Sequence, residues 1–400
     1  MREVYLDYSA TTPVKKEVLD EMLPYFSQKF GNPSSLYTKG FEAKDGLMQA
    51  RSRVANLIGA DEREIYFTSG GTESDNWAVA GTAKARRNKG NHIITTKIEH
   101  HALLHTCQQL EKEGYEVTYL DVNKDGLISL DQLQGAINEK TILISIMYAN
   151  NEVGSIQPIK EIAEIAKKHG VLFHSDAVQA LGNVPINVKD TGVDMISISG
   201  HKIYGPKGIG ALYIRKGLSI SNLLQGGAQE NKKRAGTENI PGIVGFGKAC
   251  ELAQVNLDSH INYIKELRDY FLSEIQSNVP DVNINGGMEH RLPGNLNLVF
   301  NYVEGEALIL YMDVKGIYAS TGSACSSATF SASHVLAAMG LTLEKAYSSV
   351  RFTIGDFTTK EDLDYAVAEI KVIVEKLRKI SPFNKDKEME SAQKCNCGDL

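Results

Sequence analysis

The sequence has few cysteines, no excess of basic residues and no long apolar run. Five cysteines are spread irregularly over 400 residues, and no Asn-x-Ser/Thr glycosylation sequon with a permitted middle residue occurs. The first residues lack the basic-then-apolar pattern of a secretory signal, and no apolar run reaches the roughly 18–20 residues that cross a bilayer. A formal net charge of −6 argues against nucleic acid as a main partner. These absences predict a cytoplasmic protein with free thiols in a reducing compartment.

The composition is that of a soluble globular enzyme, with 42% hydrophobic and 23% charged residues. Strand-like and helical stretches alternate from about residue 65 to residue 215, which predicts an α/β domain with a mostly parallel sheet wrapped by helices. From about Ala253 the pattern changes to long helices and shorter strands, which we interpret as a smaller α+β domain. We expect a large domain over residues 13–256, a small domain over residues 1–12 and 257–380, and a flexible tail over residues 381–400.

Three features at strand ends combine into a candidate cofactor site. Lys202 follows one predicted strand and precedes a glycine-rich hairpin, although a lysine there could also be merely solvated. The small residues Ser69–Thr72 lie between a strand and a helix, where backbone N–H groups converge on an anion, although Gly-Gly-Thr also forms ordinary turns. Asp176 follows a third strand and could hold a pyridine nitrogen protonated, or could cap the next helix. Together these features predict a site for pyridoxal 5′-phosphate (PLP) in the large domain.

Eight motifs in order make the chain resemble the NifS/IscS-type cysteine desulfurases, which are fold-type I PLP-dependent transferases related to the class V aminotransferases. The resemblance covers nearly all of the chain up to about residue 380, and its motifs are TSGGTESDN, IEHHA, ANNEVGSIQPI, HSDAVQA, SGHKIYGPKGIGAL, RAGTENI, TGSACSS and VRFTIG. It implies a seven-stranded, mostly parallel sheet in the large domain and a reactive cysteine loop in the small domain. It also implies a homodimer that binds PLP and converts L-cysteine to L-alanine.

The resemblance also implies a role for individual residues. Lys202 is the residue that bonds to PLP and later moves the Cα proton of the substrate. The phosphate is held by Gly71, Thr72, Ser199 and His201, and by Thr237 from the other subunit of the dimer. Asp176 pairs with the ring nitrogen, while Asn151 and Gln179 contact the ring hydroxyl. His100 stacks on the ring and is a candidate acid or base, and Arg351 binds the substrate carboxylate, for which a two-donor guanidinium is well shaped.

Cys325 is the residue that would decide the reaction, because many PLP enzymes share the other groups. It lies in a run of small polar residues, Ser320 to Ser327, that is poorly suited to core packing, whereas Cys250 beside FGKACELA fits a buried structural cysteine. We expect Cys325 to attack the substrate sulfur as a thiolate and to become a persulfide. A free thiol has a pKa near 8.5, so the site must supply a base, for which His100 is the candidate.

The small polar residues around Cys325 predict a mobile loop, with poor order from Ser326 to Ala332. The GSACSS form resembles the family branch with the longer cysteine loop, which implies that an Fe–S scaffold protein receives the sulfur. In such a complex, Cys325 could be a transient iron–sulfur ligand. The alternatives are a related selenocysteine lyase, a small-substrate aminotransferase, and an interaction protein that has lost its chemistry. The intact Lys202, Asp176, Cys325 and Arg351 argue against the last.

Three further features admit a metal or sulfur role but have simpler interpretations. Residues 121–132 nearly match a calcium loop, but Gln132 stands where a bidentate glutamate is needed and the preceding residues alternate like a strand. His101 and His105 could share a helix face, but no third metal ligand is apparent nearby. Cys395-x-Cys397 in the tail could bind a metal or relay sulfur, or could be incidental. We expect no resident metal.

Overall fold

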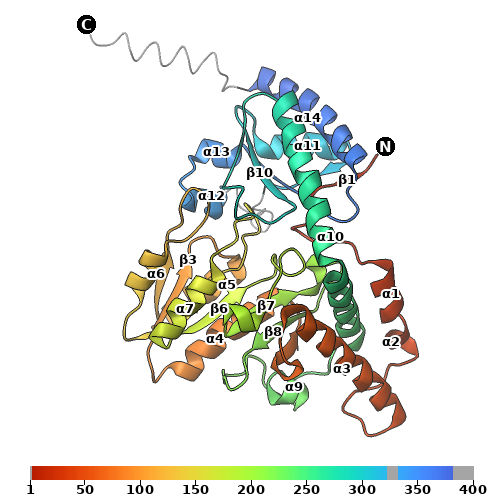
Figure 1. The fold of residues 1–400 in the computed structure, drawn as a ribbon, viewed down its shortest axis with the longest axis vertical. Helices are drawn as coiled ribbons and strands as arrows, with labels where there is room; N and C mark the ends of the chain where they lie inside the picture. Colours follow the sequence, from red (N-terminus) through yellow and green to blue (C-terminus); the bar gives the residue numbers. More distant parts are fainter. Residues whose placement is uncertain (1, 322–331, 382–400) are drawn as a thin grey trace.

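The computed structural model describes residues 2–321 and 332–381. Its centre is a seven-stranded sheet with the strand order β2-β8-β7-β6-β5-β3-β4 (Figure 1). The strands are β2 (Ile65–Thr68), β3 (His92–Thr96), β4 (Glu116–Leu120), β5 (Thr141–Ser145), β6 (Leu172–Asp176), β7 (Met195–Ser199) and β8 (Gly210–Ile214). Strand β8 runs antiparallel to both of its neighbours, and the other pairs are parallel. The predicted mostly parallel seven-stranded sheet is therefore confirmed.

The central strands are buried along their whole length because helices cover both faces of the sheet. Every residue of β5, β6 and β7 is buried, as expected for parallel strands that are covered on two sides. The longer helices of this part are α3 (Thr38–Ile58), α4 (Gly71–Arg86), α5 (His101–Lys112) and α7 (Ile159–His169). Shorter helical segments are α1 (Lys16–Met22), α2 (Pro24–Ser27), η1 (Glu62–Glu64), α6 (Leu130–Ala136), α8 (Val188–Thr191), η2 (Gly200–Lys202) and α9 (Gln229–Lys232).

Helix α10 (Ile240–Asn278) joins the sheet to the rest of the chain in one continuous run of 39 residues (Figure 1). Its start is fixed by Asn239, whose side chain accepts a hydrogen bond from the Gly242 N–H. At Gly247 a Cβ atom would lie 2.5 Å from the Cα of Ala50, so glycine allows α10 to pack closely on α3. The helix begins well before the change of pattern expected near Ala253, because its first turns are apolar and buried among other helices.

The C-terminal part has its own smaller sheets and its own apolar core. Strands β12, β10 and β9 form one antiparallel sheet, and β1 pairs with β11 in parallel. The elements are β1 (Val4–Tyr5), β9 (Val282–Ile284), β10 (Asn295–Phe300), α11 (Gly305–Val314), β11 (Ile317–Tyr318), α12 (His334–Ala338), α13 (Leu343–Tyr347), β12 (Ser349–Thr353) and α14 (Lys360–Ile380). Val4 and Leu6 pack into the same core as residues of α10, α11 and α14.

The proposed domain boundary between residues 256 and 257 falls inside α10, which therefore contributes to both apolar cores. The division into 13–256 and 1–12 with 257–380 remains a prediction, and the tail 382–400 lies outside the described residues. No helix in the described ranges combines the length and the apolar character needed to cross a membrane.

Candidate functional site

The structure brings most of the predicted site residues to the rim of one pocket of about 260 Å³. Its lining includes Gly71, Thr72, His100, Asn151, Asp176, Gln179, Ser199, His201, Lys202 and Arg351. They come from the carboxyl ends of β6 and β7, from the loops that follow β2, β3 and β5, and from β12. Because the carboxyl ends of parallel strands meet at one edge of a sheet, residues far apart in the sequence converge here.

The phosphate cup predicted at Ser69–Thr72 forms the adjoining hollow of about 360 Å³. Helix α4 begins at Gly71, so the N–H groups of its first turn and the positive end of its dipole face this hollow. A Cβ atom on Gly71 would lie 2.6 Å from Cγ2 of Val178, so glycine is required at that close approach. Ser199 and His201 also line the hollow.

Lys202 ends the short helix η2, and its amino group is held by backbone carbonyls of the N-terminal segment. The Nζ atom donates to the carbonyl oxygens of Ser9 and Ala10, the latter over 2.8 Å. Gln179 Nε2 donates to the same Ser9 carbonyl over 3.0 Å. Neither carbonyl was expected from the sequence, because backbone acceptors leave no residue-type signal.

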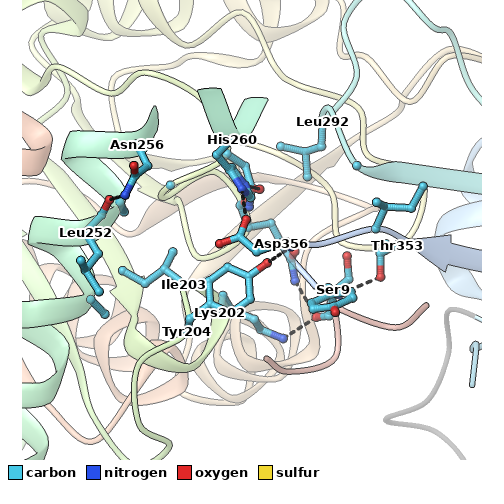
Figure 2. Close-up of a pocket in the computed structure, with 18 of the residues that line it drawn as sticks. Ser9, Lys202, Ile203, Tyr204, Leu252, Asn256, His260, Leu292, Thr353 and Asp356 are labelled. Atoms are coloured by element: carbon cyan, nitrogen blue, oxygen red, sulfur yellow. Dashed lines mark hydrogen bonds and ion pairs between the residues drawn. The ribbon is translucent and has the colours of Figure 1, made fainter. Parts of the chain in front are cut away.

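A second cavity of about 60 Å³ adjoins Lys202 and extends between the sheet and the C-terminal part. Figure 2 shows Lys202 with its amino group directed toward Ser9, and Tyr204, Asp356 and His260 above it. The Asp356 N–H donates to the Tyr204 hydroxyl, and the Asp356 carboxylate is bonded to Nδ1 of His260. Asp356 also forms an ion pair with Lys15. Through these contacts, the loop after β12 is bonded to α10 and to the N-terminal segment next to Lys202.

Asp176 is buried at the end of β6, where a carboxylate can face a ring nitrogen. Burial raises the pKa of Asp176 to about 6, against the opposing hydrogen bond from the Val178 N–H and the charge of Lys202. A second carboxyl, Asp75 of α4, lines the same pocket and is 1% exposed. Burial and the charge of Asp176 raise the pKa of Asp75 well above its ordinary value. In the described structure its Oδ1 has no hydrogen-bond partner, and the nearby His174 Nε2 lies 3.7 Å away.

His100 caps the N-terminus of α5, and this contact determines which ring nitrogen carries the proton. The Ala102 N–H donates to Nδ1 of His100 over 3.2 Å, so Nδ1 is unprotonated and the neutral ring carries its proton on Nε2. Burial, the Lys202 charge and the neighbouring histidines lower the pKa of His100 to about 4. At neutral pH His100 therefore offers a donor at Nε2, and Nδ1 is already occupied as an acceptor.

Arg351 is 3% exposed and is held from two sides. Its Nη2 donates to Asp7 Oδ1 over 2.6 Å, and its Nη1 donates to the carbonyl oxygen of Asn151 over 3.1 Å. Its Nε is buried and has no hydrogen-bond partner among the described residues. This is the arrangement that a carboxylate ligand could complete.

Among the described site residues, Thr237 does not line this pocket. Thr237 lines a separate hollow of about 200 Å³ together with Ser69 and Gly208. Its loop is attached to helix α4 by Arg234, which donates two hydrogen bonds to the carboxylate of Glu73. Cys325 and the expected mobile stretch up to residue 331 lie outside the described residues, as do Cys395 and Cys397.

The His101–His105 pair and the loop that starts at Asp121 do not form a metal site with the residues that the structure describes. Among residues 2–321 and 332–381, no three or more His, Cys, Asp or Glu side chains are placed to hold a metal ion. His101 and His105 lie with ring centroids 5.2 Å apart. Asp121 is paired with Lys97 over 2.5 Å, and its loop connects strand β4 to helix α6, as predicted.

The residues present fit a phosphorylated pyridine cofactor. The pocket and the phosphate cup share Gly71, Thr72, Ser199 and His201, so one ligand could occupy both. Asp176 supplies a buried acid for a ring nitrogen, and Lys202 supplies an amine. Asp75 also lines this pocket, and its buried Oδ1 has no hydrogen-bond partner among the described residues.

Comparison with known proteins agrees with this geometry. The aminotransferase class-V family model matches residues 4–366. The cysteine desulfurase IscS of Dictyoglomus turgidum is 54% identical over 96% of this chain and 98% of its own length, and that of Methanosarcina thermophila is 55% identical over 96% and 94%. A solved NifS-like protein superposes with a TM-score of 0.89 at 38% identity and covers 94% of this chain and 100% of its own. The chain therefore belongs to the aminotransferase class-V family and, within it, to the cysteine desulfurases of the IscS and NifS type.

Proposed function

We propose that this cysteine desulfurase binds PLP through Lys202 and transfers the sulfur of L-cysteine to Cys325, with release of L-alanine. The observation that carries the proposal is the pocket in which Lys202, Asp176 and Arg351 line one space next to the phosphate cup. Enzymes of this family depend on PLP. When bound, PLP supplies an electron sink for the negative charge that forms at the substrate Cα.

Each side chain of the pocket has a task that follows from its surroundings. Lys202 bonds to the cofactor and moves the Cα proton, and the Ser9 and Ala10 carbonyls hold its ammonium form when it is released. Asp176 keeps the ring nitrogen protonated, and Asn151 and Gln179 contact the ring hydroxyl. The backbone of Gly71 and the side chains of Thr72, Ser199 and His201 bind the phosphate. Arg351, which lines the same pocket, binds the substrate carboxylate.

The sulfur step needs the Cys325 thiolate at the substrate Cβ–S bond. The thiolate forms a new S–S bond as the Cβ–S bond breaks, so the substrate sulfur remains on Cys325 as a persulfide. Proton uptake at the former substrate carbons then gives alanine. In this proposal His100 stacks on the ring and, as a neutral imidazole, donates a hydrogen bond from Nε2. Because Nδ1 is taken by the helix cap, we assign His100 a donor role ahead of the earlier expectation of a base.

A homodimer would complete the site in this proposal. Thr237 lies outside the pocket of its own chain, which supports its action on the phosphate of a second copy. Large apolar side chains are exposed between residues 19 and 48, and they would be covered by an interface between copies: Leu19, Leu23, Phe26, Phe30, Leu36, Tyr37, Phe41 and Met48.

We place the enzyme in the cytoplasm, where an Fe–S scaffold protein accepts the sulfur. In that complex, Cys325 would be a transient iron–sulfur ligand.

Sulfur-labelled L-cysteine and the PLP-loaded enzyme provide the test. After one turnover and alkylation, mass spectrometry of peptides should place the labelled sulfur on Cys325. The Cys325→Ser variant should bind PLP with the same absorbance but release no alanine. An aminotransferase would instead form a keto acid in both proteins, and label on any other cysteine would contradict the proposal.

A further inference from the structure

Helix α12 is fastened to the turn that follows β5 by a buried hydrogen bond. Ser333 caps α12: its hydroxyl oxygen accepts from the Leu336 N–H over 3.1 Å, and its O–H donates to Glu152 Oε2. Glu152 is 3% exposed and Ser333 is 4% exposed. In addition, His334 Nε2 lies 3.0 Å from the carbonyl oxygen of Glu99, next to His100. The start of α12 is therefore fixed to two loops that carry predicted site residues.

The turn that carries Glu152 also holds the substrate side of the pocket. Asn151 lines the pocket, and its carbonyl oxygen accepts from Arg351 Nη1. The Glu152 carbonyl oxygen accepts from the side-chain amides of Asn295 and Asn297 over 3.3 and 3.2 Å. The Glu152 N–H donates to Asn150 Oδ1 over 2.8 Å. Because both the N–H and the carbonyl of Glu152 are hydrogen-bonded, the backbone of this turn is fixed. A group that is bonded to the Glu152 side chain is therefore held in a defined position.

Apolar packing reinforces the attachment of α12. Val335, Leu336 and Met339 share a buried cluster with Met147 and Val153, which flank the same turn. Capping alone does not require Glu152, because the Ser333 hydroxyl already accepts from the Leu336 N–H. A buried carboxyl is unfavourable unless its interactions offset the loss of hydration. The presence of Glu152 therefore points to a task beyond the helix cap.

Both described neighbours of the Cys325 segment are fixed close to Arg351. On the N-terminal side, the Ser320 N–H donates to the Arg351 carbonyl, and the Arg351 N–H donates to the Ser320 carbonyl over 2.6 Å. On the C-terminal side, Ser333 is held by Glu152, whose neighbour Asn151 is bonded to Arg351. Cys325 lies between these two anchors in the sequence.

We propose that Glu152 is a positioning residue that, through Ser333, fixes the C-terminal anchor of the Cys325 segment against the cofactor and substrate contacts. The proposal rests on the proposed function, in which Cys325 receives the sulfur. Burial raises the pKa of Glu152, while the hydrogen bond from Ser333 and the charge of Arg351 act in the opposite direction. Since Ser333 donates, the contact persists with Glu152 either protonated or ionised.

The test compares two partial reactions of the PLP-loaded, full-length enzyme. Exchange of the Cα proton of L-alanine in D₂O, followed by NMR, requires Lys202 and Arg351 but not Cys325. Single-turnover persulfide formation, followed by mass spectrometry, requires Cys325 as well. Glu152→Leu should slow persulfide formation about tenfold, as expected for loss of a buried hydrogen bond, and leave Cα exchange within about twofold of the wild type.

Two further variants separate positioning from a general structural role. Glu152→Gln keeps the shape and an acceptor oxygen and should form the persulfide within about threefold of the wild-type rate. Ser333→Gly removes the donor but lowers helix capping only slightly, and should behave like Glu152→Leu. Equal loss of both partial reactions in Glu152→Leu and Ser333→Gly would overturn the proposal, as would persulfide formation at the wild-type rate in both. Absence of a Cys325 persulfide in the wild type would instead contradict the proposed function itself.

Discussion

Arg351 donates a hydrogen bond to Asp7 over 2.6 Å, so the arginine expected to bind the substrate carboxylate is already paired with a carboxylate of the N-terminal segment. Burial raises the pKa of Asp7, while the charge and hydrogen bond of Arg351 lower it. The Asn151 carbonyl holds the other terminal nitrogen of the guanidinium. Together these two contacts fix the plane of Arg351, while its buried Nε has no hydrogen-bond partner among the described residues.

Removal of the Asp7 carboxylate should weaken substrate binding rather than strengthen it. In Asp7→Ala the guanidinium loses one of its two fixed contacts, and hydrogen bonds to charged groups contribute about 1.5–3 kcal/mol. We expect the KM for L-cysteine and the inhibition constant of L-alanine to rise about tenfold or more, with unchanged absorbance of bound PLP. Asp7→Asn keeps an acceptor oxygen and should show a smaller rise. Tighter alanine binding in Asp7→Ala would show that Asp7 competes with the substrate.

Substitutions of His100 should separate its helix-capping nitrogen from its pocket-facing nitrogen. Asparagine can place an acceptor near the Nδ1 position and keep the cap of α5, whereas glutamine can place a donor near Nε2 but loses the cap. We expect His100→Gln to retain more persulfide formation than His100→Asn. His100→Asn should be the more stable of the two by about 1 kcal/mol in urea unfolding.

The pH dependence offers a second check on His100. Its pKa of about 4 leaves the ring neutral throughout the range from pH 5 upward. The acid limb of kcat/KM for L-cysteine above pH 5 should therefore be the same in His100→Gln and in the wild type. Loss of that limb in the variant would show that His100 takes up a proton in this range.

The strand ends of the large domain could be predicted because their signal is local. Strand β3 matches the predicted HIITT, and Lys202 and Asp176 lie at or just after the ends of β7 and β6. A residue at the carboxyl end of a parallel strand lies at the edge of the sheet where ligands bind, and this does not depend on the details of the surrounding helices. For this reason the pocket residues taken from strand ends converge as expected.

The partners of those residues could not be predicted, because they depend on distant contacts. Asp7 and Arg351 are 344 positions apart, and Glu152 and Ser333 are 181 positions apart. No periodicity or motif in the sequence indicates such pairs, because they form only when distant parts of the chain pack together. His100 was likewise missed as a helix cap, because histidine is not among the residue types that favour that position.

Glu99 should make the cofactor-free protein less stable as the pH rises. Burial raises the pKa of Glu99 from 4.5 to about 8, against hydrogen bonds from the Met147 N–H and the Thr96 hydroxyl. The folded state therefore keeps this proton between pH 4.5 and 8, while the unfolded chain loses it. The contribution of Glu99 to stability is complete below pH 4.5 and is lost as the pH rises to 8.

The matched variant is Glu99→Gln, which cannot ionise and keeps the acceptor oxygen. Urea unfolding of both proteins from pH 4.5 to 8.5 should show the wild type losing up to about 5 kcal/mol relative to the variant. A constant difference across this range would show that Glu99 ionises normally in the fold.

The ion pair between Glu73 and Arg234 should govern how tightly the phosphate cup binds its ligand. Glu73 lies in the first turn of α4, where its Oε2 accepts from the Ser69 N–H over 2.8 Å. Arg234 neutralises this carboxylate through two hydrogen bonds of 2.9 and 3.1 Å. Burial raises the pKa of Glu73, but the bonds from Arg234 and Ser69 outweigh it and keep the pKa low, so Glu73 is charged.

Arg234→Met would leave that negative charge unpaired beside the phosphate and should raise the dissociation constant of PLP about tenfold or more, measured by titration of the cofactor-free protein. The double variant Glu73→Gln/Arg234→Met removes both charges and should recover most of the affinity, because the repulsion disappears with the carboxylate. If the double variant binds PLP as weakly as Arg234→Met alone, the arginine acts on the phosphate itself, and its pairing with Glu73 is incidental to cofactor binding.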